Sequence, residues 1–212
     1  MGQRSQIYVR YEGKLIIARY YQWNYGERMI SRARYGIEHI KCDIDEGYTF
    51  CFTTECYINR YIHIFDTNFD MKDVAISTDI FKEFEEWKVE EPELDFKQYC
   101  FTYQDNNDGK LLIDISGKTI KYAFLDSETD IKHIMSARQY MAWDSINWRH
   151  SKYIGAAGIR ACKDNIQSIN SMARLMTEQE VIDFLQTDDY FGKSQSDNTI
   201  GLSDVELKQI LL

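Results

Sequence analysis

The stretch QIYVRYEGKLIIARYYQWNYGER, residues 6–28, decides the fold, because it contains two strands, a turn and the start of a helix. Apolar and polar side chains alternate over residues 5–11 and again over 14–23, which is the period of a β-strand. Glu12 and Gly13 separate the two runs. A short, Gly-containing break between two alternating runs is typical of a β-hairpin.

The second strand of this hairpin has apolar groups on both faces, so we expect it inside a sheet rather than at an edge. Strict alternation would place Leu15 and Ile17 on one face and Ile16 and Ala18 on the other.

A helix is predicted directly after the hairpin. Asn24 and Glu27 stand three residues apart, as the two side chains of a capping box do, and they predict a helix that reaches about Ile40. Its inner face is expected to contain Met29, Ala33, Ile37 and Ile40. Its arginines, Arg28, Arg32 and Arg34, are expected on other faces.

Further runs rich in Tyr, Phe, Ile and Thr predict more strands. They are residues 48–54, 56–65, 98–104, 110–115 and 119–125. Residues 77–79 can cap a short helix over 80–87, with Phe81, Phe84 and Trp87 as its apolar anchors. From Ser127 the apolar spacing becomes helical. The helical signals there are apolar spacing over 131–141 and 159–173 and capping boxes at Thr177/Glu180 and Ser203/Glu206.

These elements predict an α+β fold with a mainly antiparallel sheet of about seven strands, a packed N-terminal helix and a C-terminal helical half. The pattern divides the chain softly into a β-rich α+β part, residues 1–126, and a helical part, residues 127–212. A chain of 212 residues fits one domain, so we expect the two parts to pack together.

Charge is distributed unevenly along the chain. Residues 1–41 contain eight Lys or Arg and three Asp or Glu, whereas residues 42–212 contain 17 basic and 31 acidic residues. A basic patch on an acidic body suits a small anion or an acidic partner surface and disfavours binding to duplex nucleic acid. The five cysteines show no CxxC spacing, and no leader or membrane segment is evident, so we expect a cytoplasmic protein with reduced thiols.

The Arg- and aromatic-rich start is the candidate binding site. Its residues are Arg4, Arg10, Arg19, Tyr21, Gln22, Trp23, Asn24, Tyr25, Arg28 and Arg32. Arginine binds phosphate or carboxylate through a planar fork of donors, while aromatic rings and amides can hold a planar group. The alternative is structural: the rings pack between sheet and helix, and the arginines pair with the acidic body.

Metal and catalytic chemistry have weaker signals. Possible zinc ligands lie close together in sequence, but their spacing matches no known zinc pattern; they are His39, Cys42, Cys51, Cys56 and His63. Asp66 to Asp70 alternates oxygen ligands as a calcium loop does, without the required Gly and Glu. No nucleophile, P-loop or dinucleotide motif occurs, and Gly155 to Gly158 is a weak anion signal. We therefore assign no catalytic residue, metal or cofactor.

An acidic run extends from Glu83 to Asp95. Such a run could present phosphate-like charge to a nucleic-acid-binding protein, or it could simply be a solvated surface. Both interpretations stay open.

The opening MGQRSQIYVR, together with ARYYQWNYGER at residues 18–28, resembles a group of uncharacterised proteins from Firmicutes and their phages. Members similarly open Met-Gly-x-Arg-Ser and contain a Tyr-x-Gln-Trp or Tyr-x-Gln-Tyr segment. The resemblance covers roughly the first 40 residues and carries no activity. It implies a bacterial or phage cytosol, where small acidic proteins often bind a host protein or a signalling molecule.

Two functional hypotheses follow. The first is a non-enzymatic binding protein, encoded by a phage or mobile element, that engages a host protein as an inhibitor or regulator. The second is an enzyme or sequestering protein for a nucleotide-like anion, held by Arg10, Arg19, Trp23 and Arg28. A nucleotide site needs these side chains to converge in a concave pocket, whereas a partner-binding face should be broad and flat. A homo-oligomer is compatible with both.

Overall fold

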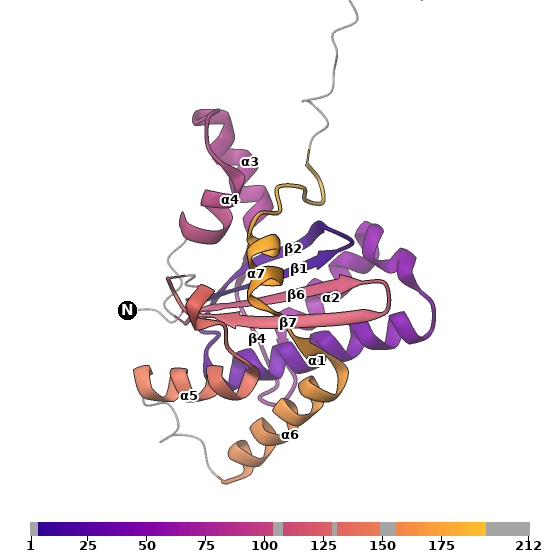
Figure 1. The fold of residues 1–212 in the computed structure, drawn as a ribbon, viewed down its shortest axis with the longest axis vertical. Helices are drawn as coiled ribbons and strands as arrows, with labels where there is room; N and C mark the ends of the chain where they lie inside the picture. The colour runs from indigo at the N-terminus through magenta and orange to yellow at the C-terminus, as the bar shows by residue number, and fades with distance from the viewer. Residues whose placement is uncertain (1–3, 104–107, 129–130, 149–155, 194–212) are drawn as a thin grey trace, which may run out of the picture.

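A six-stranded sheet forms the centre of the molecule (Figure 1). The computed structural model describes residues 4–103, 108–128, 131–148 and 156–193. The sheet has the order β5-β2-β1-β6-β7-β8, and its strands are β1 (Arg4–Tyr11), β2 (Lys14–Gln22), β5 (Ser77–Asp79), β6 (Lys110–Ser116), β7 (Thr119–Leu125) and β8 (Arg174–Leu175). Among the strand pairs of this sheet in the described residues, β1/β6 and β7/β8 are parallel and the others are antiparallel. The α+β class with a mainly antiparallel sheet is confirmed, with six strands in that sheet. A separate pair, β3 (Thr67–Asn68) and β4 (Asp73–Val74), forms a small antiparallel hairpin.

The predicted hairpin is present, and β2 lies inside the sheet between β1 and β5. The strict alternation predicted for β2 is wrong, however, because the pairing of β1 with β2 shifts its register between Val9 and Arg10. Ile16 and Ile17 both enter the same core cluster, while Leu15 enters the cluster on the opposite face. A β-bulge adds one residue to a strand and so reverses the alternation beyond it.

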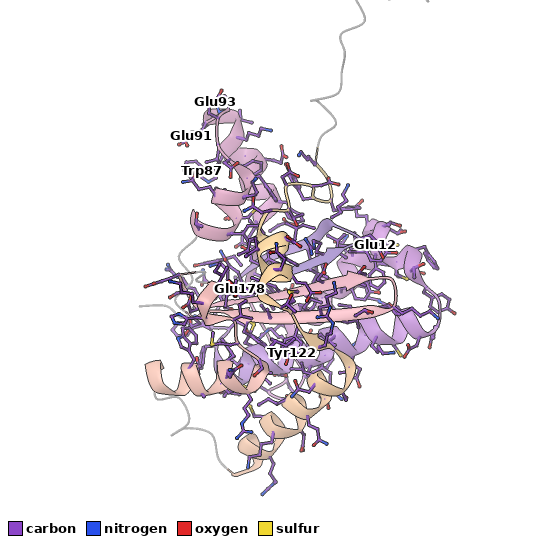
Figure 2. The ribbon with its side chains drawn as sticks, in the orientation of Figure 1. Glu12, Trp87, Glu91, Glu93, Tyr122 and Glu178 are labelled. Carbon is purple, nitrogen blue, oxygen red and sulfur yellow. The ribbon has the colours of Figure 1, made fainter. Side chains whose placement is uncertain are left out.

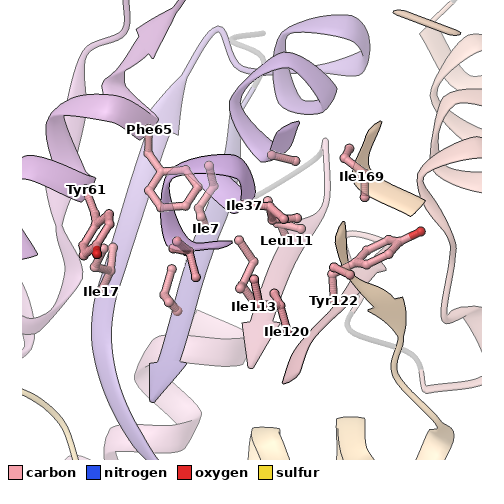
Figure 3. Close-up of a cluster of buried hydrophobic side chains, with 14 of the residues drawn as sticks. Ile7, Ile17, Ile37, Tyr61, Phe65, Leu111, Ile113, Ile120, Tyr122 and Ile169 are labelled. Atoms are coloured by element: carbon pink, nitrogen blue, oxygen red, sulfur yellow. The ribbon is translucent and has the colours of Figure 1, made fainter. Parts of the chain in front are cut away.

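Helices cover both faces of the sheet. One face is covered by α1 (Gly26–Asp45), α2 (Glu55–Asp66), α5 (Ala137–Trp148) and α6 (Ala156–Met172). The other face is covered by α3 (Ile80–Glu90), α4 (Phe96–Gln98) and α7 (Glu178–Leu185). Figure 3 shows the first core, in which Ile7, Ile17 and Leu111 of the strands lie close to Ile37 of α1 and Phe65 of α2. Within the described residues, no helix is long and apolar enough to cross a membrane.

Helix α1 is confirmed, and its predicted inner face is buried. Its predicted cap is wrong. Tyr25 is the N-cap residue and makes no side-chain cap hydrogen bond, whereas the Asn24 amide points into the interior. Arg32 is also buried, although the sequence pattern places it on an outer face.

Three predicted strands are helical instead. Residues 48–54 contain the short 3₁₀ helix η1 (Thr49–Thr53), and residues 56–65 belong to α2. Residues 98–104 largely continue α4 as a π-helical turn, η2 (Tyr99–Tyr103). Aromatic and β-branched residues favour any well-packed face, and in α2 the buried Ile58, Tyr61, Ile64 and Phe65 follow a helical period rather than a period of two.

The remaining predictions mostly hold. Helix α3 begins after Asp79, whose carboxylate accepts from the backbone of Phe81 and Lys82, but Trp87 is exposed rather than an anchor. The capping box at Thr177 is present at the start of α7. The helix expected over 131–141 begins later: a 3₁₀ turn, η3 (Ile131–His133), precedes α5. The capping box at Ser203 lies outside the described residues.

Candidate binding surface

The ten predicted site residues do not converge on one point. Arg10 lies at the far end of β1, where its Nε donates to Asp114 Oδ1 at 2.8 Å and its NH1 donates to Thr187 Oγ1 at 3.0 Å. Its guanidinium also lies over the Phe184 ring. Arg4 lies at the other end of the same strand, on the order of 20 Å away at a strand rise of about 3.3 Å per residue. The two arginines therefore cannot contact one small ligand.

Four of the other predicted site residues belong to one hydrogen-bond network beneath the β3–β4 hairpin; they are Arg19, Tyr21, Asn24 and Arg32. Tyr21 donates through its hydroxyl to Asp66 Oδ1 at 3.1 Å, and Ser77 donates to the same oxygen at 2.8 Å. Arg19 completes this chain, because its NH2 donates to Ser77 Oγ at 2.6 Å and its NH1 lies 3.4 Å from Asp79. Burial, followed by the charge of Asp66, raises the pKa of Tyr21 well above its ordinary value.

Arg32 is the centre of the second half of this network. Its side chain is 0% exposed, and its NH1 donates to Asn24 Oδ1 at 3.0 Å. Its NH2 lies 3.5 Å from the backbone carbonyl of Asp66 and 3.9 Å from Asp73. The Asn24 amide in turn donates to Ser5 Oγ at 2.8 Å. Burial lowers the pKa of Arg32, while Tyr21 and Asp73 act in the opposite direction. This side chain joins the start of the sheet, α1 and the β3–β4 hairpin.

Arg28 also pairs with an aspartate of the β3–β4 hairpin. Its NH1 donates to Asp73 Oδ2 at 2.7 Å, and its guanidinium lies 5.6 Å from the ring of the half-buried Tyr25. Arg10, Arg19, Arg28 and Arg32 are thus each placed beside an aspartate of the acidic body. This placement corresponds to the structural alternative stated for the sequence.

Trp23 and Gln22 are the predicted site residues that face outward most clearly. Trp23 is 55% exposed, and its φ of 60° lies in the left-handed region. The backbone N–H of Gln22 donates to the carbonyl of Ile76 at 3.2 Å, which brings this corner beside the segment from Val74 to Ile76 that links β4 and β5. These two side chains are 69% and 70% exposed. We refer to Trp23, Val74 and Ile76 as the Trp23 face.

Two cavities of about 350 Å³ lie away from this face. The first is lined by residues of β2, α2 and α3, both apolar, as Ile16, Ile58 and Phe81 are, and charged, as Glu55 and Lys82 are. The second lies next to it and is lined by Tyr11, Phe52 and Phe191 among others. None of the ten predicted site residues lines either cavity.

The sequence did not reveal a buried carboxylate at the start of α1. Asp144 of α5 is 1% exposed, and its carboxylate lies against Gly26, where an added Cβ would come within 2.6 Å of Oδ2. Burial and then the charge of Glu27 raise the pKa of Asp144 to about 7, while the Gly26 N–H lowers it. A carboxylate at this end of α1 interacts favourably with the helix dipole. No motif surrounds Asp144 in the sequence that could have marked it.

Metal sites are not supported in the described part of the chain. It contains no group of three or more His, Cys, Asp or Glu side chains placed to hold an ion. Asp66 and Asp70 of the calcium-like run instead accept hydrogen bonds, Asp70 from Tyr35 and Asn165. Of the weak anion signal, Gly155 lies outside the described residues.

No family model, curated protein or solved structure matches this chain.

Proposed function

We propose that this chain is a non-enzymatic binding protein that engages a partner protein through the Trp23 face. The observation that carries the proposal is the contrast between paired arginines and an exposed apolar corner. The arginines lie beside aspartates of the same chain, whereas Trp23, Val74 and Ile76 are each more than half exposed. Interface hot spots are enriched in tryptophan, and burying one large apolar side chain contributes about 1.5–3 kcal/mol.

Backbone conformation adds support. A non-glycine residue with positive φ costs on the order of 1 kcal/mol and persists where the surrounding structure or function requires it. Glycine would relieve that cost at position 23. A tryptophan held there, with its ring directed outward, suits recognition better than it suits stability.

The nucleotide-like alternative lacks such an observation. It requires Arg10, Arg19, Trp23 and Arg28 to surround one ligand, but Arg10 pairs with Asp114 at the opposite end of β1. The resemblance of the opening residues supports a host protein as the partner and a phage or mobile element as the source.

The test is native mass spectrometry of the protein purified gently from its native cells. We expect a stoichiometric partner protein that is lost in a Trp23→Ala, Ile76→Lys double variant. Phe50→Ala is the matched control, because Phe50 is 52% exposed and belongs to a different surface. The proposal is wrong if the partner stays bound to the double variant. It is also wrong if the co-purifying species is a small adduct of a few hundred daltons that Arg28→Ala removes.

A further inference from the structure

A second exposed apolar group lies on a projecting part of the molecule. Residues 79–98, which we call the α3–α4 arm, stand out from the body in Figure 1. The last turn of α3 exposes Trp87 by 51% and Val89 by 82%. Figure 2 shows Trp87 near the outer end of the arm, with Glu91 and Glu93 beyond it. Single exposed apolar residues are common, but a tryptophan at the end of a protruding helix is placed for contact.

The base of the arm is packed against the body through aromatic rings. Phe84 and Phe96 pack with ring centroids 5.1 Å apart, and Phe96 stacks on Tyr190 at 4.3 Å. Both helices of the arm are capped, because the Asp79 carboxylate accepts from Phe81 N at 3.0 Å and Asp95 accepts from Gln98 N at 2.8 Å. The exposed end is therefore preorganised, and binding through it costs little conformational entropy.

The charge of the arm restricts what can bind there. Between residues 79 and 98 the chain has eight acidic and three basic residues. Its exposed carboxylates are those of Glu86, Glu90, Glu91, Glu93 and Asp95. The Lys82–Glu86 pair, at 3.8 Å, is an exposed pair of a kind that neutralises little. A nucleic acid or an anionic membrane would be repelled, whereas a Lys- and Arg-rich surface would be attracted.

We propose that the α3–α4 arm docks on the basic, nucleic-acid-binding surface of a partner protein. The carboxylates take the place of phosphates, and Trp87 stacks on a partner guanidinium. The inference rests on the proposed function in requiring a protein partner, but it concerns a different surface and names the chemistry of the partner.

The experiment places the photo-cross-linking residue p-benzoylphenylalanine at position 89 of the full chain, expressed in its native cells. The same residue at position 74 reports on the Trp23 face, and at the exposed position 118 in the β6–β7 turn it reports on random collision. We expect an adduct at position 89 whose cross-linked partner peptide is rich in Lys and Arg. Excess duplex DNA should reduce that adduct about tenfold, because it competes for the basic surface. Glu86→Lys, Glu90→Lys and Glu91→Lys together should reduce it by a similar factor.

The other outcomes separate the two proposals. An adduct at position 74, with none at position 89 above the level at position 118, overturns this inference and leaves the proposed function standing. An adduct at position 89 that survives both DNA and the charge reversal also overturns it. Adducts at neither position above that control level overturn both proposals.

Discussion

The Arg-rich start of the chain and the acidic α3–α4 arm both stand out in the sequence by their charge, but the structure uses their charge in opposite ways. In the first region Arg19, Arg28 and Arg32 lie beside Asp79 and Asp73 beneath a hairpin, and Arg32 is completely buried. In the arm five carboxylates are exposed, those of Glu86, Glu90, Glu91, Glu93 and Asp95. Charge density therefore does not identify a binding surface. What distinguishes the two regions is whether the chain supplies the partner charge itself.

The largest effect is expected on the free energy of unfolding, from a substitution in the Arg-rich start of the chain. Arg32→Ala should lower the free energy of unfolding by about 3–5 kcal/mol, because it leaves buried polar groups of Asn24 and Asp66 without their donor. Arg34→Ala is the matched control on the same helix. Its partner is the i,i+4 residue Glu38, and we expect a loss below about 0.5 kcal/mol. Urea unfolding monitored by circular dichroism measures both. A loss below about 1 kcal/mol in Arg32→Ala would contradict a structural role for this network.

The next largest effect is expected on the pH dependence of stability, and it comes from the buried Asp144. Its folded pKa of about 7 lies above the unfolded value of about 3.9. Between these values the folded protein binds more protons than the unfolded chain, so stability falls as pH rises from about 4 to about 7. Asp144→Asn should remove this slope and raise the free energy of unfolding at pH 8 by about 1–3 kcal/mol.

The control for this effect comes from the arm. Glu91→Gln also removes one carboxylate, but at an exposed site, and should leave the unfolding profile between pH 4 and pH 8 within about 0.5 kcal/mol of the unmodified protein. An unchanged slope in Asp144→Asn would show that the burial of Asp144 does not determine how stability depends on pH.

A smaller effect tests the strained corner of the Trp23 face. Trp23→Gly and Trp23→Ala both remove the exposed ring, but only glycine relaxes the positive φ. We expect the Gly variant to be more stable than the Ala variant by up to about 1 kcal/mol in thermal unfolding. Equal stabilities would mean that the conformation at this corner carries no strain, and the argument from strain for a recognition role would be withdrawn.

The sequence predicted the β1–β2 hairpin, α3 and the capped α7 because each has local punctuation and a clear period. It predicted α1 from the apolar period alone, since the expected cap is wrong. It failed where a composition typical of strands outweighed the helical period. The aromatic residues of α2 resemble a strand by composition, and only the burial of Tyr61, Ile64 and Phe65 on one face reveals a helix. The bulge at Ile16 has no sequence signature within the hairpin. Asp144 has none either, because its burial depends on Gly26, which is distant in the chain.

The candidate site shows the same limit. The sequence marks the Arg- and aromatic-rich region by its composition, but it cannot show which arginines lie beside aspartates more than 40 residues away, as Arg28 does with Asp73. Asp73 lies on β4 of the small hairpin, in a stretch that predicted neither strand nor helix. Exposure of Trp23 follows from the same tertiary arrangement and not from its neighbours in sequence.

The smallest expected effect is on the stability of the arm itself, and it separates the two uses of charge most directly. Glu90→Gln, Glu91→Gln and Glu93→Gln together should change the free energy of unfolding by no more than about 0.5 kcal/mol, because exposed carboxylates contribute little to folding. The variant should nevertheless lose the salt dependence of partner binding, because fewer charges steer the encounter. Denaturant titration and binding at two salt concentrations measure the two quantities on one sample. A destabilisation above about 1 kcal/mol would mean that these carboxylates have partners within the fold, and the arm would then resemble the Arg-rich start instead of contrasting with it.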